Sequence, residues 1–242
     1  MRKDKLKILA CPANEGGCAY YRIILPFQKL QELHSDEVEV RMDMNPLGWD
    51  KDVMQEQKTG KPVILKDWTP ENIEWADIVV HQNIHNFGGG YTFELLRRAA
   101  MLGKLTHYDN DDLLTDLYDG HRLFGAYKDN KLADLTKEIY SFVDIVSVTQ
   151  RKFAERVADF CGRALVIIKN AIDFNLPCWN MEKLPPPKKR LTRVGWVGGI
   201  HHEEDVKEFP GVAMAVNAKA GPENVHWGWY GRPPMPINEE TG

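Results

Sequence analysis

Three aspartates within four residues form the densest group of side chains in this sequence that could do chemistry. Asp109, Asp111 and Asp112 follow a short apolar stretch at 105–108. Carboxylates this close can hold a divalent metal ion, or shift one another's pKa so that one of them acts as a general base. They can also bind a polar substrate or cap the short helix that we expect at 113–118. We favour substrate binding or capping over metal, with Asp109 and Asp111 as catalytic candidates and Asp112 as a binding residue.

Two histidines follow another buried strand. His81 ends the apolar run at 75–81, and His85 lies in the loop beyond it. A histidine at a strand end can hydrogen-bond a substrate or take a proton from a hydroxyl group. The alternative is a histidine whose hydrogen bonds are satisfied by the neighbouring backbone. We take His81 as a catalytic candidate and His85 as a substrate-binding one.

A pair of glycines follows the first expected strand. Gly16 and Gly17 let the backbone approach a ligand, and the helix after them offers free N–H groups to a phosphate or hydroxyl group. Tyr21 and Arg22 lie near the start of that helix, where Arg22 could clamp a phosphate through two hydrogen bonds. The alternative is a simple strand-to-helix turn with Arg22 in a surface ion pair.

A second glycine pair lies near the end of the chain. The apolar run at 193–197 stops at Gly198 and Gly199, and His201 and His202 follow. Glycines there permit close backbone approach to a diphosphate, and a histidine cation could neutralise it. Adjacent histidines rarely point at one ion, and no third ligand is obvious in the sequence, so we expect no zinc site.

The elements that must position these residues alternate between strands and helices. This alternation predicts an α/β fold with a doubly wound, Rossmann-like parallel sheet. The carboxyl ends of parallel strands share one edge, so we expect the loops at 16–22, 81–90 and 109–112 to lie together there. The expected strands are 6–10, 38–42, 75–81, 105–108, 144–148 and 164–168, and the expected helices are 19–33, 91–102, 132–142 and 150–160.

The sequence after residue 172 predicts a hinge and a second, partial Rossmann-like domain. A proline-rich linker is expected at 173–192, after a first domain at 1–172. Asn170 and Asp173 suit the turn into this hinge, and we count both as substrate-binding candidates. Two strands and one helix at 193–242 cannot bury a stable core. We therefore expect that part to dock on the first domain, or to be completed by a partner chain or a second copy.

Composition narrows the class of protein. Lys and Arg total 31 against 35 Asp and Glu, which gives a net charge of −4. The composition therefore shows no excess of basic residues of the kind that binds nucleic acid or an anionic membrane. The four cysteines have no Cys-x-x-Cys spacing, so zinc and thioredoxin-like redox sites are not expected. No apolar run is long enough for a signal peptide or a membrane span. These features predict a cytoplasmic protein.

Several of these motifs, taken in order, resemble GT-B glycosyltransferases. The run at 16–22 resembles the glycine-bearing loop of that family. The segments at 144–149 and 166–173 are similar to the end of its N-terminal domain. The segments at 195–199 and 227–231 resemble strand ends of its donor-binding domain. The turn Tyr108-Asp-Asn-Asp-Asp is similar to one in a group common in bacteriophage genomes and bacterial surface-sugar clusters.

The resemblance implies transfer of a sugar from a nucleoside-diphosphate sugar to a hydroxyl group on a glycan, lipid, protein or modified base. It implies no metal and no cofactor beyond this co-substrate, with Arg22 and the loop at 198–202 stabilising the leaving diphosphate. A late Glu-x7-Glu motif would fall beyond residue 242, so the donor domain is expected to be truncated. The alternatives are a non-catalytic binding or assembly component, and a metal-dependent transferase that uses the aspartates at 109–112.

Overall fold

The structure is a computed structural model that describes residues 4–49, 71–84, 88–121, 123–176, 192–198 and 211–231. The chain divides into two compact units, Met1–Ile172 and Asp173–Gly242. Each unit is described by itself.

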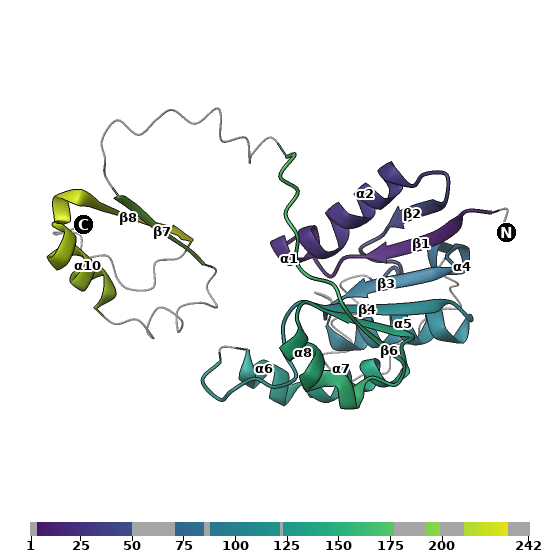
Figure 1. Ribbon diagram of the computed structural model, residues 1–242. Coiled ribbons are helices and arrows are strands. Elements are labelled where there is room, and N and C mark those ends of the chain that lie inside the picture. The colour runs from purple at the N-terminus through teal and green to yellow at the C-terminus, as the bar shows by residue number, and fades with distance from the viewer. Residues whose placement is uncertain are drawn as a thin grey trace. The chain divides into compact units, whose positions relative to one another are not determined.

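The first unit is built on a six-stranded parallel sheet with the strand order β2-β1-β3-β4-β5-β6 (Figure 1). The strands are β1 (Leu6–Cys11), β2 (Val38–Met42), β3 (Ile78–Gln82), β4 (Leu105–Asn110), β5 (Ile145–Val148) and β6 (Ala164–Ile167). The chain winds outward from β1 to β2, then returns across β1 to build β3 to β6. The expected α/β, Rossmann-like parallel sheet is therefore confirmed, with a topological switch point between β1 and β3.

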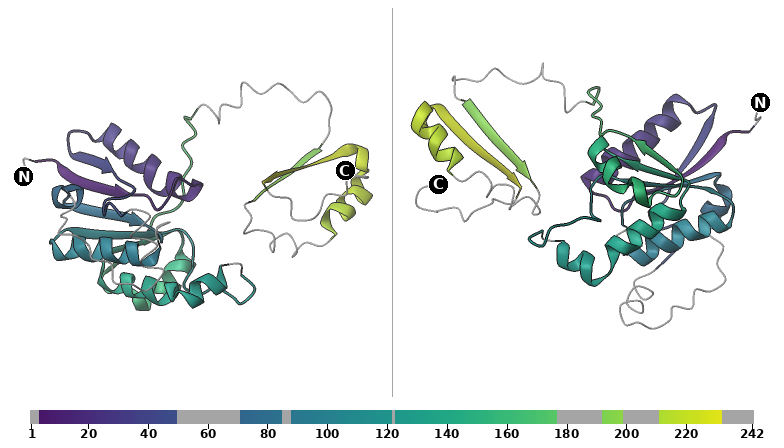
Figure 2. Two further views of the ribbon diagram at one scale, coloured as in Figure 1. Left: turned by 180° about the vertical axis from the view of Figure 1, so that it is seen from behind. Right: turned by 60° about the horizontal axis from the view of Figure 1, so that its bottom comes forward.

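Helices lie on both faces of this sheet, as the views in Figures 1 and 2 show. A continuous helical stretch crosses one face near β1 and β2, and α5, α7 and α8 lie on the opposite face. The elements are α1 (Gly17–Ala19), the π-helical turn η1 (Tyr20–Ile24), α2 (Leu25–Leu33), α4 (Glu71–Trp75), α5 (Gly89–Met101), α6 (Phe124–Asp129), α7 (Leu132–Phe142), α8 (Arg151–Val157) and the 3-10 turn η2 (Ala158–Phe160).

The alternation of side chains along β1 explains how the sheet holds two layers of helices. Ile8 and Ala10 pack with Ile23 of η1 on one face. Leu9 and Cys11 pack on the other face, against the buried side of α5. Because both faces of the strand are covered, its sequence is almost continuously apolar rather than alternating.

One expected helix is wrong. Residues 113–118 form a turn region, in which the Leu114 amide donates to the Asp112 carbonyl at 2.9 Å. Leu113 packs against the apolar cluster under α5 and α7, and Asp116 pairs with Arg156 of α8. These contacts fix the segment as a connection, and the next helix of the chain is α6.

The second unit contains a parallel pair of strands, β7 (Thr192–Gly198) and β8 (Val225–Gly231), with the helix α10 (Val212–Ala220) and the 3-10 turn η6 (Pro222–Asn224). Among its described side chains only Val225 is buried, and Val197 and Met214 are 80% and 74% exposed. The expected strand, helix and strand are thus present with little buried core. None of the described helices of either unit combines the length and apolar composition needed to cross a bilayer.

Candidate functional site

The candidate site is the carboxyl edge of the sheet around the switch point. Cys11, His81 and Tyr108 are register partners, so β1, β3 and β4 end together. The described parts of the three loops expected to share an edge do leave the sheet there. Ligands of open α/β sheets bind in the crevice that such a switch point creates.

The glycine loop after β1 contains a tight turn beside open space. The Gly16 amide donates to Asn14 Oδ1 at 2.7 Å, and a Cβ atom added to Gly16 would lie 2.8 Å from that oxygen. A Cβ atom added to Gly17 would meet nothing within 4 Å. Asn14 and Gly16 therefore form a tight turn, whereas Gly17 leaves exposed backbone that a ligand can approach.

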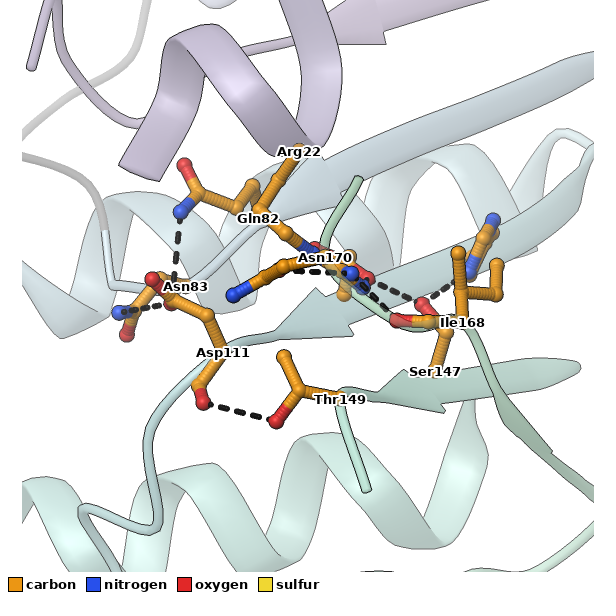
Figure 3. A network of polar contacts seen from close by, with 10 residues as sticks. Arg22, Gln82, Asn83, Asp111, Ser147, Thr149, Ile168 and Asn170 are labelled. Carbon is orange, nitrogen blue, oxygen red and sulfur yellow. Dashed lines mark hydrogen bonds and ion pairs between the residues drawn. The ribbon is translucent and has the colours of Figure 1, made fainter. Parts of the chain in front are cut away.

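Arg22 faces inward and does not lie on the surface. Its Nε donates to Asp109 Oδ2 at 2.9 Å and a terminal nitrogen donates to Oδ1, while the other terminal nitrogen donates to the Ile168 carbonyl and, at 3.2 Å, to Asn170 Oδ1 (Figure 3). Arg22 is 7% and Asp109 3% exposed. The surface ion pair offered as the alternative for Arg22 is therefore wrong, because the pair with Asp109 is buried and begins in the π-helical turn η1; the phosphate clamp stays a prediction.

A serine and a histidine extend this buried network. Ser147 Oγ donates to Asp109 Oδ1 and lies 2.7 Å from Nε2 of His107. A hydroxyl group has one proton, so Ser147 must accept from His107, which therefore carries its proton on Nε2. Burial lowers the pKa of His107, more strongly than the neighbouring Asp109 raises it, and Arg22 lowers it further. His107 is consequently held neutral in the folded protein.

This arrangement predicts a pH dependence of stability that belongs to His107. Because its pKa is lower in the folded than in the unfolded chain, the unfolded chain binds more protons below about pH 6.5. The contribution to stability is thus complete above that pH and is lost as the pH falls toward the folded pKa. Urea unfolding at about pH 7 and about pH 5 should show a smaller loss of stability in His107→Gln than in the unaltered protein. Equal losses in both proteins would contradict a neutral, buried His107.

Asp111 is the centre of a second, more open polar cluster. Its Oδ1 accepts from Asn83 Nδ2 at 3.3 Å and from Gln82 Nε2 at 3.5 Å, and its carbonyl accepts from Thr149 Oγ1 at 3.2 Å (Figure 3). Burial, together with a hydrogen bond to Asp111, raises the pKa of the Cys18 thiol to about 12. The cluster therefore connects the glycine loop with the ends of β3, β4 and β5.

Two features of this cluster are typical of a binding site. Gln82 is 1% exposed, yet its Oε1 has no hydrogen-bond partner among the described residues. Buried polar atoms are normally paired, so this oxygen is available to a donor. Asn83 has a φ of 51°, in the left-handed region, and its amide donates to the Asp109 carbonyl at 2.8 Å. Backbone held in such a conformation is often found where a site is preorganised.

His81 does not face the edge as the sequence suggested. It is fully buried, with its ring 6.4 Å from that of Tyr108. Side chains alternate along β3, so His81 shares the face of Val79, which packs with α5, and Gln82 lies on the opposite face with its register partner Asp109. Of the three catalytic candidates, His81 and Asp109 are buried, and only Asp111 is partly exposed.

The remaining candidates lie apart from this cluster or outside the described residues. Asp112 is exposed, and Tyr21 is 39% exposed with its ring edge-on to that of Tyr20. Asp173 Oδ1 accepts from the Asn175 amide at 2.9 Å, a turn of the kind expected there. Gly198 ends β7 in the second unit. The candidates outside the described residues are His85, Gly199, His201 and His202.

Sequence reasoning missed Gln82, Asn83, His107, Ser147 and Thr149. Ser147 had a signal, because it is a polar residue inside the apolar strand β5. Gln82 and Asn83 directly follow His81 at the end of β3, which is where binding residues are expected in a parallel sheet. His107 and Thr149 gave no signal beyond their residue type.

Metal binding depends on oxygen atoms that other side chains do not already occupy. Among the described residues, no three His, Cys, Asp or Glu side chains group closely enough to hold an ion. Both oxygens of Asp109 accept hydrogen bonds from Arg22, and one also accepts from Ser147. The Asp109 carboxylate is therefore already fully used within the chain.

No protein-family model and no curated protein matches this chain.

Proposed function

We propose that the protein is a glycosyltransferase of the GT-B kind, and that its first unit binds the acceptor. The observation that carries this proposal is the Asp111 cluster, which lies at the switch point beside the open backbone of Gly17. Carboxylate and carboxamide groups bind hydroxyl groups as acceptors and donors. A polar edge of this composition suits a hydroxyl-bearing substrate.

In the proposed reaction, Asp111 takes the proton of the acceptor hydroxyl group. The hydroxyl oxygen attacks the anomeric carbon of the donor sugar, and the bond between that carbon and the diphosphate oxygen breaks. The nucleoside diphosphate leaves with the bonding electron pair. Gln82 and Asn83 hold the Asp111 carboxylate in place, and such positioned general bases accelerate reactions about 10²–10⁴-fold. We assign the donor to the second unit, as the family resemblance implies.

A binding protein without transferase activity is the second candidate. The observation that favours it is the inward position of Arg22 and His81, two residues expected to serve the transfer reaction. In this reading the same edge binds a hydroxyl-rich ligand, and no sugar is transferred.

Measuring turnover by the full chain distinguishes the glycosyltransferase from the binding protein. Release of nucleoside diphosphate should be measured with a panel of nucleoside-diphosphate sugars, with and without sugar acceptors. A valine at position 17 covers the open backbone, so Gly17→Val should weaken acceptor use about tenfold. Its unfolding midpoint should change little, because a Cβ atom added to Gly17 meets nothing within 4 Å.

Gly125→Val is the matched control, since a Cβ atom added to Gly125 in α6 also meets nothing within 4 Å and Gly125 is not part of the Asp111 cluster. Acceptor-dependent release that is equal in all three proteins would overturn the proposed acceptor site. Acceptor binding without any release would leave the binding protein as the function.

A further inference from the structure

A cavity of about 270 Å³ lies between the turn region after β4, the helix α6 and the beginning of α7. The residues assigned to the proposed transfer step, Asp111, Gln82 and Asn83, do not line it. Its walls include Thr115, Phe124, Tyr127, Lys128, Lys131 and Asp134.

Tyr127 points to a ligand in this cavity. Its side chain lines the cavity and is 9% exposed. Within the described part of the chain its hydroxyl group makes no hydrogen bond and is not among the buried unpaired atoms, so a ligand in the cavity can reach it. Burial raises the pKa of Tyr127, and the charges of Asp112 and Asp111 raise it further. The hydroxyl group is therefore a donor, and the cavity adjoins the acidic turn of the proposed acceptor site.

The charges around the cavity favour an anion. Lys128 and Lys131 both line it, and neither forms an ion pair with another described residue. Of the two acidic residues in the wall, Asp116 pairs with Arg156, so within the wall the two lysines face one carboxylate without an ion pair, Asp134. An ammonium group beside a neutral tyrosine hydroxyl is a good match for a carboxylate or phosphate oxygen.

The size of the cavity and its aromatic wall restrict the class of ligand further. The volume of about 270 Å³ lies just below the range of about 300–1,000 Å³ found for small-molecule sites, which suits one sugar ring better than a nucleotide. Phe124 offers a flat apolar face, over which the Lys128 ammonium group lies at 5.6 Å. Sugar rings stack on such faces through their C–H groups.

From these observations we infer that the cavity binds an acidic sugar, one that carries a carboxylate or a phosphate, as the acceptor. The inference rests on the proposed function, because it names the acceptor class of that site. The lysines recognise the acidic group, Tyr127 donates to it, and Phe124 supports the ring.

Calorimetry on the full chain tests this without any donor sugar. The probes are glucuronate, glucose 6-phosphate, glucose and inorganic phosphate. At least one acidic sugar should bind about tenfold more tightly than glucose and than inorganic phosphate. The double variant Lys128→Met/Lys131→Met should weaken that binding about tenfold, and Tyr127→Phe should weaken it as well.

Lys137→Met is the control, because Lys137 lies on α7 over the ring of Phe160 and does not line the cavity. The exposed lysines can be replaced without loss of fold, so the test stands even if Tyr127→Phe unfolds. Equal affinity for glucose and both acidic sugars, or unchanged affinity in the double variant, would overturn the inference. If inorganic phosphate binds as tightly as glucose 6-phosphate and glucuronate does not bind, the cavity recognises phosphate alone. That result would overturn the inference that the ligand is a sugar.

The two proposals can fail separately. Acidic-sugar binding without turnover would contradict the proposed transferase activity and support the cavity as a sugar-binding site. Turnover of neutral acceptors without acidic-sugar binding would contradict the inferred sugar site in the cavity and support the transferase activity.

Discussion

Replacing Arg22 by methionine should lower the free energy of unfolding of the first unit by about 3–5 kcal/mol. The substitution leaves the Asp109 carboxylate, 3% exposed, without its cation. It also removes a donor to the Ile168 carbonyl and to Asn170 just after β6, so that η1, β4 and the end of the sheet lose a common contact. Urea unfolding followed by far-UV circular dichroism measures the loss.

An exposed ion pair provides the control for this prediction. Arg156 and Asp116 also pair, but their side chains are 63% and 50% exposed. Arg156→Met should therefore cost at most about 1 kcal/mol. The double variant Arg22→Met/Asp109→Leu should be more stable than Arg22→Met alone, because no unpaired charge then stays buried. A loss in Arg22→Met no larger than in Arg156→Met would show that the Arg22–Asp109 pair does not stabilise the fold.

The sheet and most of its helices could be predicted because their signals are local. The expected bounds 38–42 and 132–142 agree with β2 and α7, whose apolar residues follow a strand or helix period over the whole element. Alternation of strands and helices then restricts the sheet to parallel winding. The position of three loops at one edge follows from that winding alone.

The contacts within the site could not be predicted in the same way. Arg22 and Asp109 are 87 residues apart, and nothing local indicates that the π-helical turn directs Arg22 into the sheet. The sequence places His81 and Gln82 at one strand end, but which of them lies on the face covered by α5 depends on the register of the whole sheet. The turn at 113–118 was missed because its tertiary contacts override its helix propensity.

The second large effect expected is on the transfer step. Asp111→Asn should lower the rate of sugar transfer about 10²–10⁴-fold, because the amide cannot take the proton of the acceptor hydroxyl group. The side chain keeps its shape and its Oδ1, so hydrogen bonds from Gln82 and Asn83 can still form. Since Asp111 is partly exposed, stability should change by no more than about 0.5 kcal/mol.

The most direct test of the proposed site is kcat/KM for sugar transfer by the full chain, compared between the unaltered protein, Asp111→Asn and Asp119→Asn. Asp119 is an exposed aspartate in the turn that precedes α6, outside the Asp111 cluster. The proposed chemistry predicts a loss of about 10²–10⁴-fold in Asp111→Asn and none in Asp119→Asn, with equal unfolding midpoints. Undiminished transfer by Asp111→Asn would contradict the assignment of the carboxyl edge as the catalytic acceptor site.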